Sequence, residues 1–176
     1  MNRLLLLVPL LALLCWSPAP AQTAGTDSAL YEPLNREQVM AIARRLETDP
    51  LGEGARTLRQ AAMQWLARST DLLMTPCDEL MSPMATWHAK YGNELMSQIL
   101  LSGAAFLLAH PDSATDPIAV HRAGMIGCLR AYEAILRREP REVIPSLDLF
   151  IEYRDYGNFD DYIARVTAPC ACRGEY

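Results

Sequence analysis

One segment of the chain, residues 94–109, is apolar on almost every face of a helix. A helix with so little polar surface must be surrounded by other protein elements or by lipid. Its length of about 16 residues is short of the roughly 20 that a bilayer-spanning helix needs. Ser97, Gln98 and Ser102 also interrupt its apolar surface. The segment therefore predicts a central helix, capped by Asn93, around which a helical domain packs.

Amphipathic segments on both sides of this helix supply its packing partners. The first begins with a capping-box pattern at Asn35 and Gln38 and ends before Asp49. The next has Leu58 and Ala62 on an apolar face, with Arg56, Arg59, Gln60 and Arg68 on a polar face. Further helices are predicted over residues 117–139 and 147–156 and, after a cap at Asn158, over residues 159–166, whereas residues 75–91 are irregular. No alternating strand pattern occurs, so the predicted fold class is all-α, an irregular bundle of five or six helices.

Two glycines in the predicted helix 117–139 indicate a close helix–helix contact. Gly124 and Gly127 each cost about 1 kcal/mol inside a helix, so a neighbour that needs their missing side chains is expected. Gly103 in the central helix is the expected point of approach. His121, near the start of the same helix, is expected to face solvent.

The first 21 residues have the three parts of a cleaved signal peptide. A positive start ending at Arg3 precedes an apolar run from Leu4 to Trp16, and small residues up to Ala21 follow. Cleavage after Ala21 would leave a disordered leader at residues 22–34 and a single helical domain at residues 35–176. Lipid attachment at Cys15 is the alternative, and the bulky Leu14 before it disfavours that processing. We therefore expect an exported protein, periplasmic or secreted, with no transmembrane segment after cleavage.

Four cysteines follow the predicted cleavage site, and an even number in an exported chain favours disulfides. Cys170 and Cys172 are too close in sequence to pair with each other without strain. Two disulfides that join this tail to Cys77 and Cys128, in either order, are the expectation. A redox role for Cys170 and Cys172 is the alternative, and no basic residue precedes them to lower a thiol pKa.

The formal net charge of −5 becomes one unit more negative when the segment containing Arg3 is removed. Such a charge disfavours nucleic acid and anionic membranes as partners. Aromatic and acidic residues gather near the carboxyl terminus, a composition typical of protein-binding surfaces. The predicted partner surface comprises Tyr153, Tyr156, Tyr162, Asp160 and Asp161.

Two stretches resemble known helical proteins. Residues 128–140 resemble the second helix of a tetratricopeptide repeat, but no period of about 34 residues recurs in the chain. Residues 91–95, 103–111 and 123–136 together resemble a family of uncharacterised exported bacterial proteins. That resemblance implies a helical fold and no particular activity, ligand or catalytic residue.

Residues that could bind a metal or catalyse a reaction are few. Met81, Met84 and His88, close to Cys77, have ligand types that suit Cu(I), although both methionines also suit a core. The carboxylate pairs Asp78–Glu79 and Asp160–Asp161 stand at predicted helix starts, where acids complement the helix dipole. No serine or cysteine elbow, phosphate loop or histidine triad occurs. We expect no cofactor, no catalytic residue and no bound metal.

These observations favour a non-enzymatic exported module that binds another protein or stabilises an envelope assembly. A periplasmic immunity or inhibitor protein is one form that such a module could take. The alternative is a small exported hydrolase or copper carrier that uses residues 75–91.

Overall fold

The computed structural model describes residues 34–70, 72, 77–85 and 89–172, without the side chains of the last two. All of its elements belong to one compact unit, Pro33–Tyr176. The described residues form helices and no strand, which confirms the predicted all-α class. The elements are α1 (Arg36–Thr48), α2 (Ala55–Arg68), α3 (Asp78–Met81), α4 (Gly92–Ala109), the 3₁₀ helix η2 (Pro111–Thr115), α5 (Pro117–Arg138), α6 (Pro145–Asp155) and α7 (Phe159–Cys172). No helix among these residues is both long enough and apolar enough to cross a bilayer.

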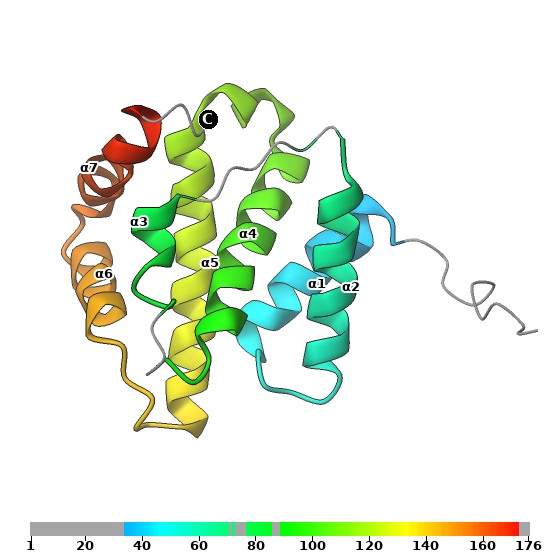
Figure 1. The fold of residues 1–176 in the computed structure, drawn as a ribbon, viewed down its shortest axis with the longest axis horizontal. Helices are drawn as coiled ribbons and strands as arrows, with labels where there is room; N and C mark the ends of the chain where they lie inside the picture. The colour runs from blue at the N-terminus through cyan, green and yellow to red at the C-terminus, as the bar shows by residue number, and fades with distance from the viewer. Residues whose placement is uncertain (1–33, 71, 73–76, 86–88, 173–176) are drawn as a thin grey trace, which may run out of the picture. The chain divides into compact units, whose positions relative to one another are not determined.

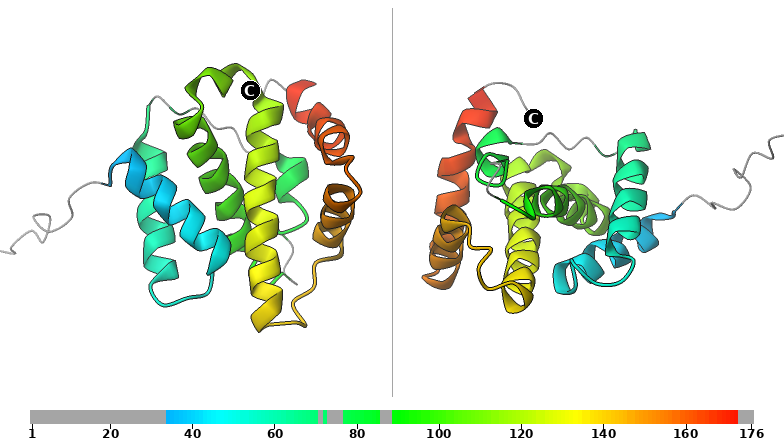
Figure 2. Two further views of the ribbon diagram at one scale, coloured as in Figure 1. Left: turned by 180° about the vertical axis from the view of Figure 1, so that it is seen from behind. Right: turned by 60° about the horizontal axis from the view of Figure 1, so that its bottom comes forward.

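Helices α4 and α5 lie side by side in the middle of this unit (Figure 1). Helices α1 and α2 pack on one side of the pair, and α3, α6 and α7 lie on the other side (Figure 2). The apolar residues of α4 are therefore covered from several directions, as the sequence predicts. Leu95, Ile99, Leu101 and Ala104 are among its buried residues.

Two glycines of α5 allow the close contact with α4. A β-carbon at Gly124 would lie 2.6 Å from the carbonyl oxygen of Ile99, and one at Gly127 would lie 1.9 Å from Ser102 Oγ. Any larger residue would push the two helices apart. The predicted close approach is confirmed, but it falls at Ile99 and Ser102 of α4 rather than at Gly103.

A polar network joins α1 to this central pair. The Gln98 side-chain amide donates to the carbonyl of Ala43 at 3.1 Å and to Ser102 Oγ at 2.9 Å. Ser102 donates in turn to Glu47, which also forms an ion pair with Arg130 of α5. The Gln98 amide nitrogen and the Ser102 hydroxyl therefore bind protein groups, which offsets part of the cost of burying these side chains, although Gln98 Oε1 has no partner.

Several helix ends follow their local signals. The Asn35 side chain accepts from the Gln38 amide at 2.9 Å, and the Gln38 side chain accepts from the Asn35 amide at 2.8 Å. Asp116 caps α5 with a hydrogen bond from Ala119 N, and Pro117 occupies the first turn. Local hydrogen bonding alone sets these boundaries, so they can be read from sequence.

The end of α7 differs from the prediction. The last helix was predicted to end at residue 166, yet α7 continues to Cys172 with Pro169 inside it. Cys170 is fully buried and disulfide-bonded, so tertiary contacts hold the last turn despite the lost backbone donor. Helix α4 starts at Gly92, one residue before the predicted cap Asn93, and α6 starts at Pro145, two residues before the predicted start at residue 147.

Candidate functional site

The five residues of the predicted partner surface lie on α6, α7 and the turn between them. Tyr156 is the C-cap of α6 and is 83% exposed. Gly157 follows with φ of 82°, a left-handed conformation that glycine adopts without strain and that lets the chain turn into α7. Tyr156 is therefore displayed at a corner of the molecule rather than packed into it.

Tyr153 and Tyr162 behave differently, because they stack on each other. Their ring centroids lie 3.8 Å apart with an interplanar angle of 11°, and both residues are half-buried. Phe150 meets Tyr162 edge-to-face beneath the pair, and burial raises the pKa of Tyr162. The guanidinium of Arg165 lies over both tyrosine rings, at 5.8 and 5.4 Å from their centroids. The three tyrosines are thus not equally exposed: two form a platform, and the third projects beside it.

The acidic members of this surface are partly neutralised. Asp160 forms an ion pair with Arg122 of α5. Arg154 binds Glu133 at 2.7 Å and Asp155 at 2.9 Å, and the hydrogen bond to Glu133 is the main reason that its pKa is raised. Among the residues that the structure describes, Asp161 forms no ion pair. The surface therefore retains negative charge around its exposed tyrosine.

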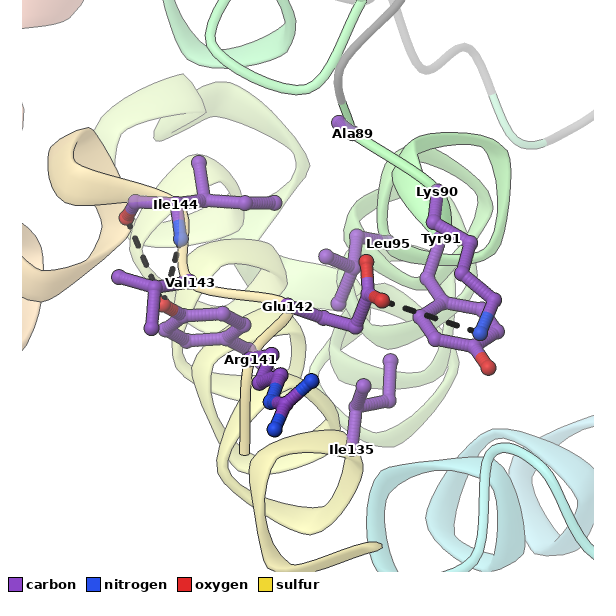
Figure 3. A pocket seen from close by; sticks show the side chains of 10 residues that line it. Ala89, Lys90, Tyr91, Leu95, Ile135, Arg141, Glu142, Val143 and Ile144 are labelled. Atoms are coloured by element: carbon purple, nitrogen blue, oxygen red, sulfur yellow. Dashed lines mark hydrogen bonds and ion pairs between the residues drawn. The ribbon is translucent and has the colours of Figure 1, made fainter. Parts of the chain in front are cut away.

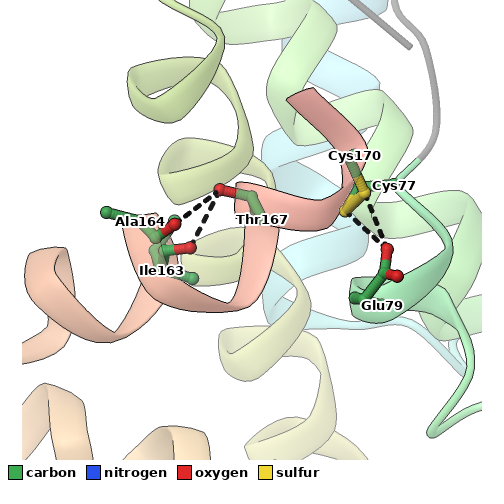
Figure 4. Close-up of a disulfide and its surroundings, with 6 residues drawn as sticks. All are labelled: Cys77, Glu79, Ile163, Ala164, Thr167 and Cys170. Atoms are coloured by element: carbon green, nitrogen blue, oxygen red, sulfur yellow. Dashed lines mark hydrogen bonds between the residues drawn. A yellow bond between two sulfur atoms is a disulfide. The ribbon is translucent and has the colours of Figure 1, made fainter. Parts of the chain in front are cut away.

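One of the two expected disulfides is present. Cys77, just before α3, is bonded to Cys170 near the end of α7, with the Cα atoms 5.7 Å apart (Figure 4). A carboxylate oxygen of Glu79 lies 2.8 Å from Cys170 Sγ and 3.5 Å from Cys77 Sγ. These three side chains could bind a metal ion only if both cysteines were reduced thiolates. In the disulfide the two sulfurs are bonded to each other, so they do not provide that ligand set.

Cys128 does not form the second disulfide that the sequence led us to expect. It is a free cysteine, fully buried in α5, with its sulfur 3.7 Å from Met84 Sδ. Burial strongly raises the pKa of its thiol, so it stays protonated and is a poor nucleophile. The prediction that Cys128 forms a disulfide, which was based on the even number of cysteines, is therefore wrong. The side chain of Cys172 lies outside the described residues.

Of the proposed copper ligands, the structure describes Met81 and Met84, and both belong to the packing of the main core. Met84 is 1% exposed within the main core, and Met81 packs against that core. His88 lies outside the described residues. With Cys77 in a disulfide and Met84 surrounded by apolar side chains, the copper-carrier alternative loses two of its ligands.

The remaining residues that the sequence analysis considered for chemistry, the two carboxylate pairs and two of the histidines, contact other parts of the protein. One member of each carboxylate pair has a partner: Glu79 lies against the disulfide, and Asp160 forms an ion pair with Arg122. His110 is the C-cap of α4. His121 is a correction: it is only 6% exposed, and burial lowers its pKa.

A small cavity lies between the start of α4 and the end of α5 (Figure 3). Its volume of about 50 Å³ is enough for little more than water. The Tyr132 hydroxyl accepts from Ile144 N at 2.8 Å at one side, and Lys90 pairs with Glu142 at 3.8 Å at the other. The cavity is too small to hold a substrate.

A larger cleft of about 500 Å³ lies next to it, and the sequence did not predict it. The α1–α2 connection and the beginnings of α2 and α4 line the cleft together with the end of α5. Arg59 was expected on the polar face of its helix, but it is one of the three buried residues of α2. Its spacing from Ala55 and Ala62, four and three residues away, matches a buried helical face and is the signal that could have indicated this position.

Comparison of the chain with known protein families, curated proteins and solved structures finds no match.

Proposed function

We propose that this chain is an exported, non-enzymatic helical protein that binds another protein through its α6–α7 surface. This surface consists of Leu149, Glu152, Tyr153, Tyr156, Asp161 and Tyr162. The single observation that supports it most is the exposure of Tyr156 beside the stacked pair of Tyr153 and Tyr162.

The spacing along α6 supports a contact face. Leu149, Glu152, Tyr153 and Tyr156 follow one another at helical intervals of three, one and three residues, which places them on one side of the helix. Leu149 is 41% exposed, so this side presents an aliphatic and an aromatic group to solvent. Isolated exposed apolar residues are ordinary, but an aligned pair next to a preformed tyrosine platform is typical of an interaction site.

The preformed geometry favours binding energetically. Tyrosine offers a large contact area and loses little conformational entropy when fixed, and the Tyr153–Tyr162 stack under Arg165 is already ordered. Glu152 and Asp161, which precede Tyr153 and Tyr162 in the sequence, are both exposed and add negative charge to this surface. The matching partner is a protein with an apolar pocket for Tyr156 and basic groups at the rim.

Export rests on the N-terminal pattern of residues 1–21 and agrees with the Cys77–Cys170 disulfide. It can be tested separately from binding. Expression of the full chain in a bacterium, followed by fractionation and N-terminal sequencing, should give a mature protein in the periplasm or medium that begins at Gln22. A cytosolic protein that retains residues 1–21 would contradict this part of the proposal.

Binding can be tested by placing a photo-crosslinking amino acid at position 156 in the source cells. The control is the same amino acid at position 44, because Arg44 is exposed on α1, across the central pair from α6 and α7 (Figure 2). A protein cross-linked from position 156 and not from position 44 is the expected result.

The captured protein must then bind the purified, oxidised chain in solution. Tyr156→Ala should weaken that binding at least about tenfold, whereas Arg44→Ala should leave it unchanged. Asp161→Asn should slow association and reduce its dependence on salt. Equal affinity for the Tyr156→Ala and unsubstituted proteins would reject this surface as the binding site.

A further inference from the structure

The cleft at the beginning of α2 contains a buried guanidinium, that of Arg59, in which one buried N–H group has no hydrogen-bond partner. Arg59 is 9% exposed and lines the cleft. Its Nη2 donates to the carbonyl of Pro50 at 2.8 Å, but its buried Nε has no hydrogen-bond partner. A guanidinium has five N–H donors, and a buried charge without acceptors is costly. Burial lowers the pKa of Arg59, and the nearby positive charge of Arg56 lowers it further, whereas the negative charge of Glu94 raises it.

The surroundings of Arg59 favour an anion. Arg56 also lines the cleft and is exposed, so its side chain is available to a ligand. Helix α2 starts there, and its N-cap, Gly54, has no side chain to accept from the first turn. The N-terminal end of a helix attracts negative charge through its dipole and its amide groups.

The remaining charges of the cleft are largely paired. Arg138 binds Asp49 at 2.8 Å, and Glu139 binds Lys90 at 3.7 Å. Glu94 is the one lining carboxylate for which the described residues show no ion pair. Two guanidiniums and a helix N-terminus therefore face a single uncompensated carboxylate.

We propose that this cleft is a binding site for a small oxyanion, the carboxylate or phosphate group of a low-molecular-weight ligand, held by Arg59 and Arg56 at the start of α2. Arg59 is fixed by its bond to Pro50 and provides the preorganised part of the site. Arg56 closes on the ligand from the solvent side. The site is separate from the α6–α7 surface, because α2 and α6 lie on opposite sides of the central pair (Figure 1).

The site can be tested with inorganic phosphate and with acetate, each titrated into the full-length oxidised protein against sodium chloride of equal ionic strength. Two-dimensional amide NMR should show saturable shifts at residues 52–59 with at least one of the two probes and none with chloride. A response to phosphate alone or acetate alone would identify the oxyanion class. Shifts spread over the whole surface, or the same response to chloride, would overturn the proposal.

Substitutions provide the second measurement. Arg56→Ala should weaken binding of the responding probe about tenfold, since charge-assisted hydrogen bonds are lost, and Arg44→Ala is the control with the same charge change. Arg59→Lys keeps the positive charge but loses the planar set of guanidinium N–H donors, and it should weaken binding by a similar factor. If Arg59→Lys does not fold, Arg56→Ala still decides the matter, because equal affinity for Arg56→Ala and Arg44→Ala would overturn the proposal.

Discussion

Gly127 of α5 lies directly against Ser102 of α4, so that a β-carbon at position 127 would stand 1.9 Å from the serine hydroxyl oxygen and 2.4 Å from its β-carbon. That hydroxyl is held in place by Glu47 and Gln98. It cannot rotate away without breaking the network that joins α1 to the central pair. The missing side chain at position 127 therefore helps to set the distance between the two longest helices, together with that at Gly124.

Gly127→Ala should lower the free energy of unfolding by about 1 to 3 kcal/mol, even though alanine is the better helix former, because overpacking outweighs the gain in propensity. Urea denaturation measures the change. The double variant Ser102→Gly/Gly127→Ala removes the clash with Ser102, and it should lose less than the sum of the two single variants. Additive losses would mean that this contact does not determine the helix spacing.

Reduction of the disulfide should destabilise the protein substantially. Cys77 and Cys170 are 93 residues apart, and the chain-entropy model gives about 3 to 5 kcal/mol for a loop of that size. Thermal unfolding of Cys77→Ser/Cys170→Ser should therefore occur at a clearly lower temperature than that of the oxidised unsubstituted chain, and adding reductant should not lower the variant's unfolding temperature further. Cys128→Ala is the matched control, since its thiol is free and the protein should keep its sensitivity to reductant. If reductant did not lower the unfolding temperature of Cys128→Ala, the response to reductant would depend on Cys128 and this prediction would be wrong.

Tyr132→Phe should cost about 1 to 3 kcal/mol, because it leaves buried polar groups unpaired. The Tyr132 hydroxyl accepts from Ile144 N at 2.8 Å and donates to Asp148 at 2.9 Å, and burial raises its pKa to about 12. Tyr156→Phe, at an exposed position, is the control and should be neutral. Denaturant titrations compare the two, and equal effects would show that the hydroxyl bonds add nothing.

His121 should make stability depend on pH. Its folded pKa lies below the ordinary value of 6.5 because burial disfavours the charged ring. The unfolded chain then binds the proton more readily, so the stability is complete above pH 6.5 and falls as the pH drops through the folded pKa. Urea unfolding over this range should show a smaller loss in His121→Gln than in the unsubstituted protein. His110→Gln, at an exposed helix end, should retain the full loss, and a flattened curve there would contradict the assignment.

The sequence by itself determined the helical class, the central position of α4 and the caps at Asn35 and Asp116. These features depend on apolar periodicity and on hydrogen bonds between residues three or four positions apart, which are readable from a single chain. Only the tertiary structure decided that Cys77 pairs with Cys170, that Cys128 and His121 are buried, and that α7 runs through Pro169. It also brought Arg59 into a cleft with α4 and α5 and stacked Tyr153 on Tyr162. Each of these depends on which faces of distant helices meet, and that is decided by the packing of the whole core rather than by any local signal.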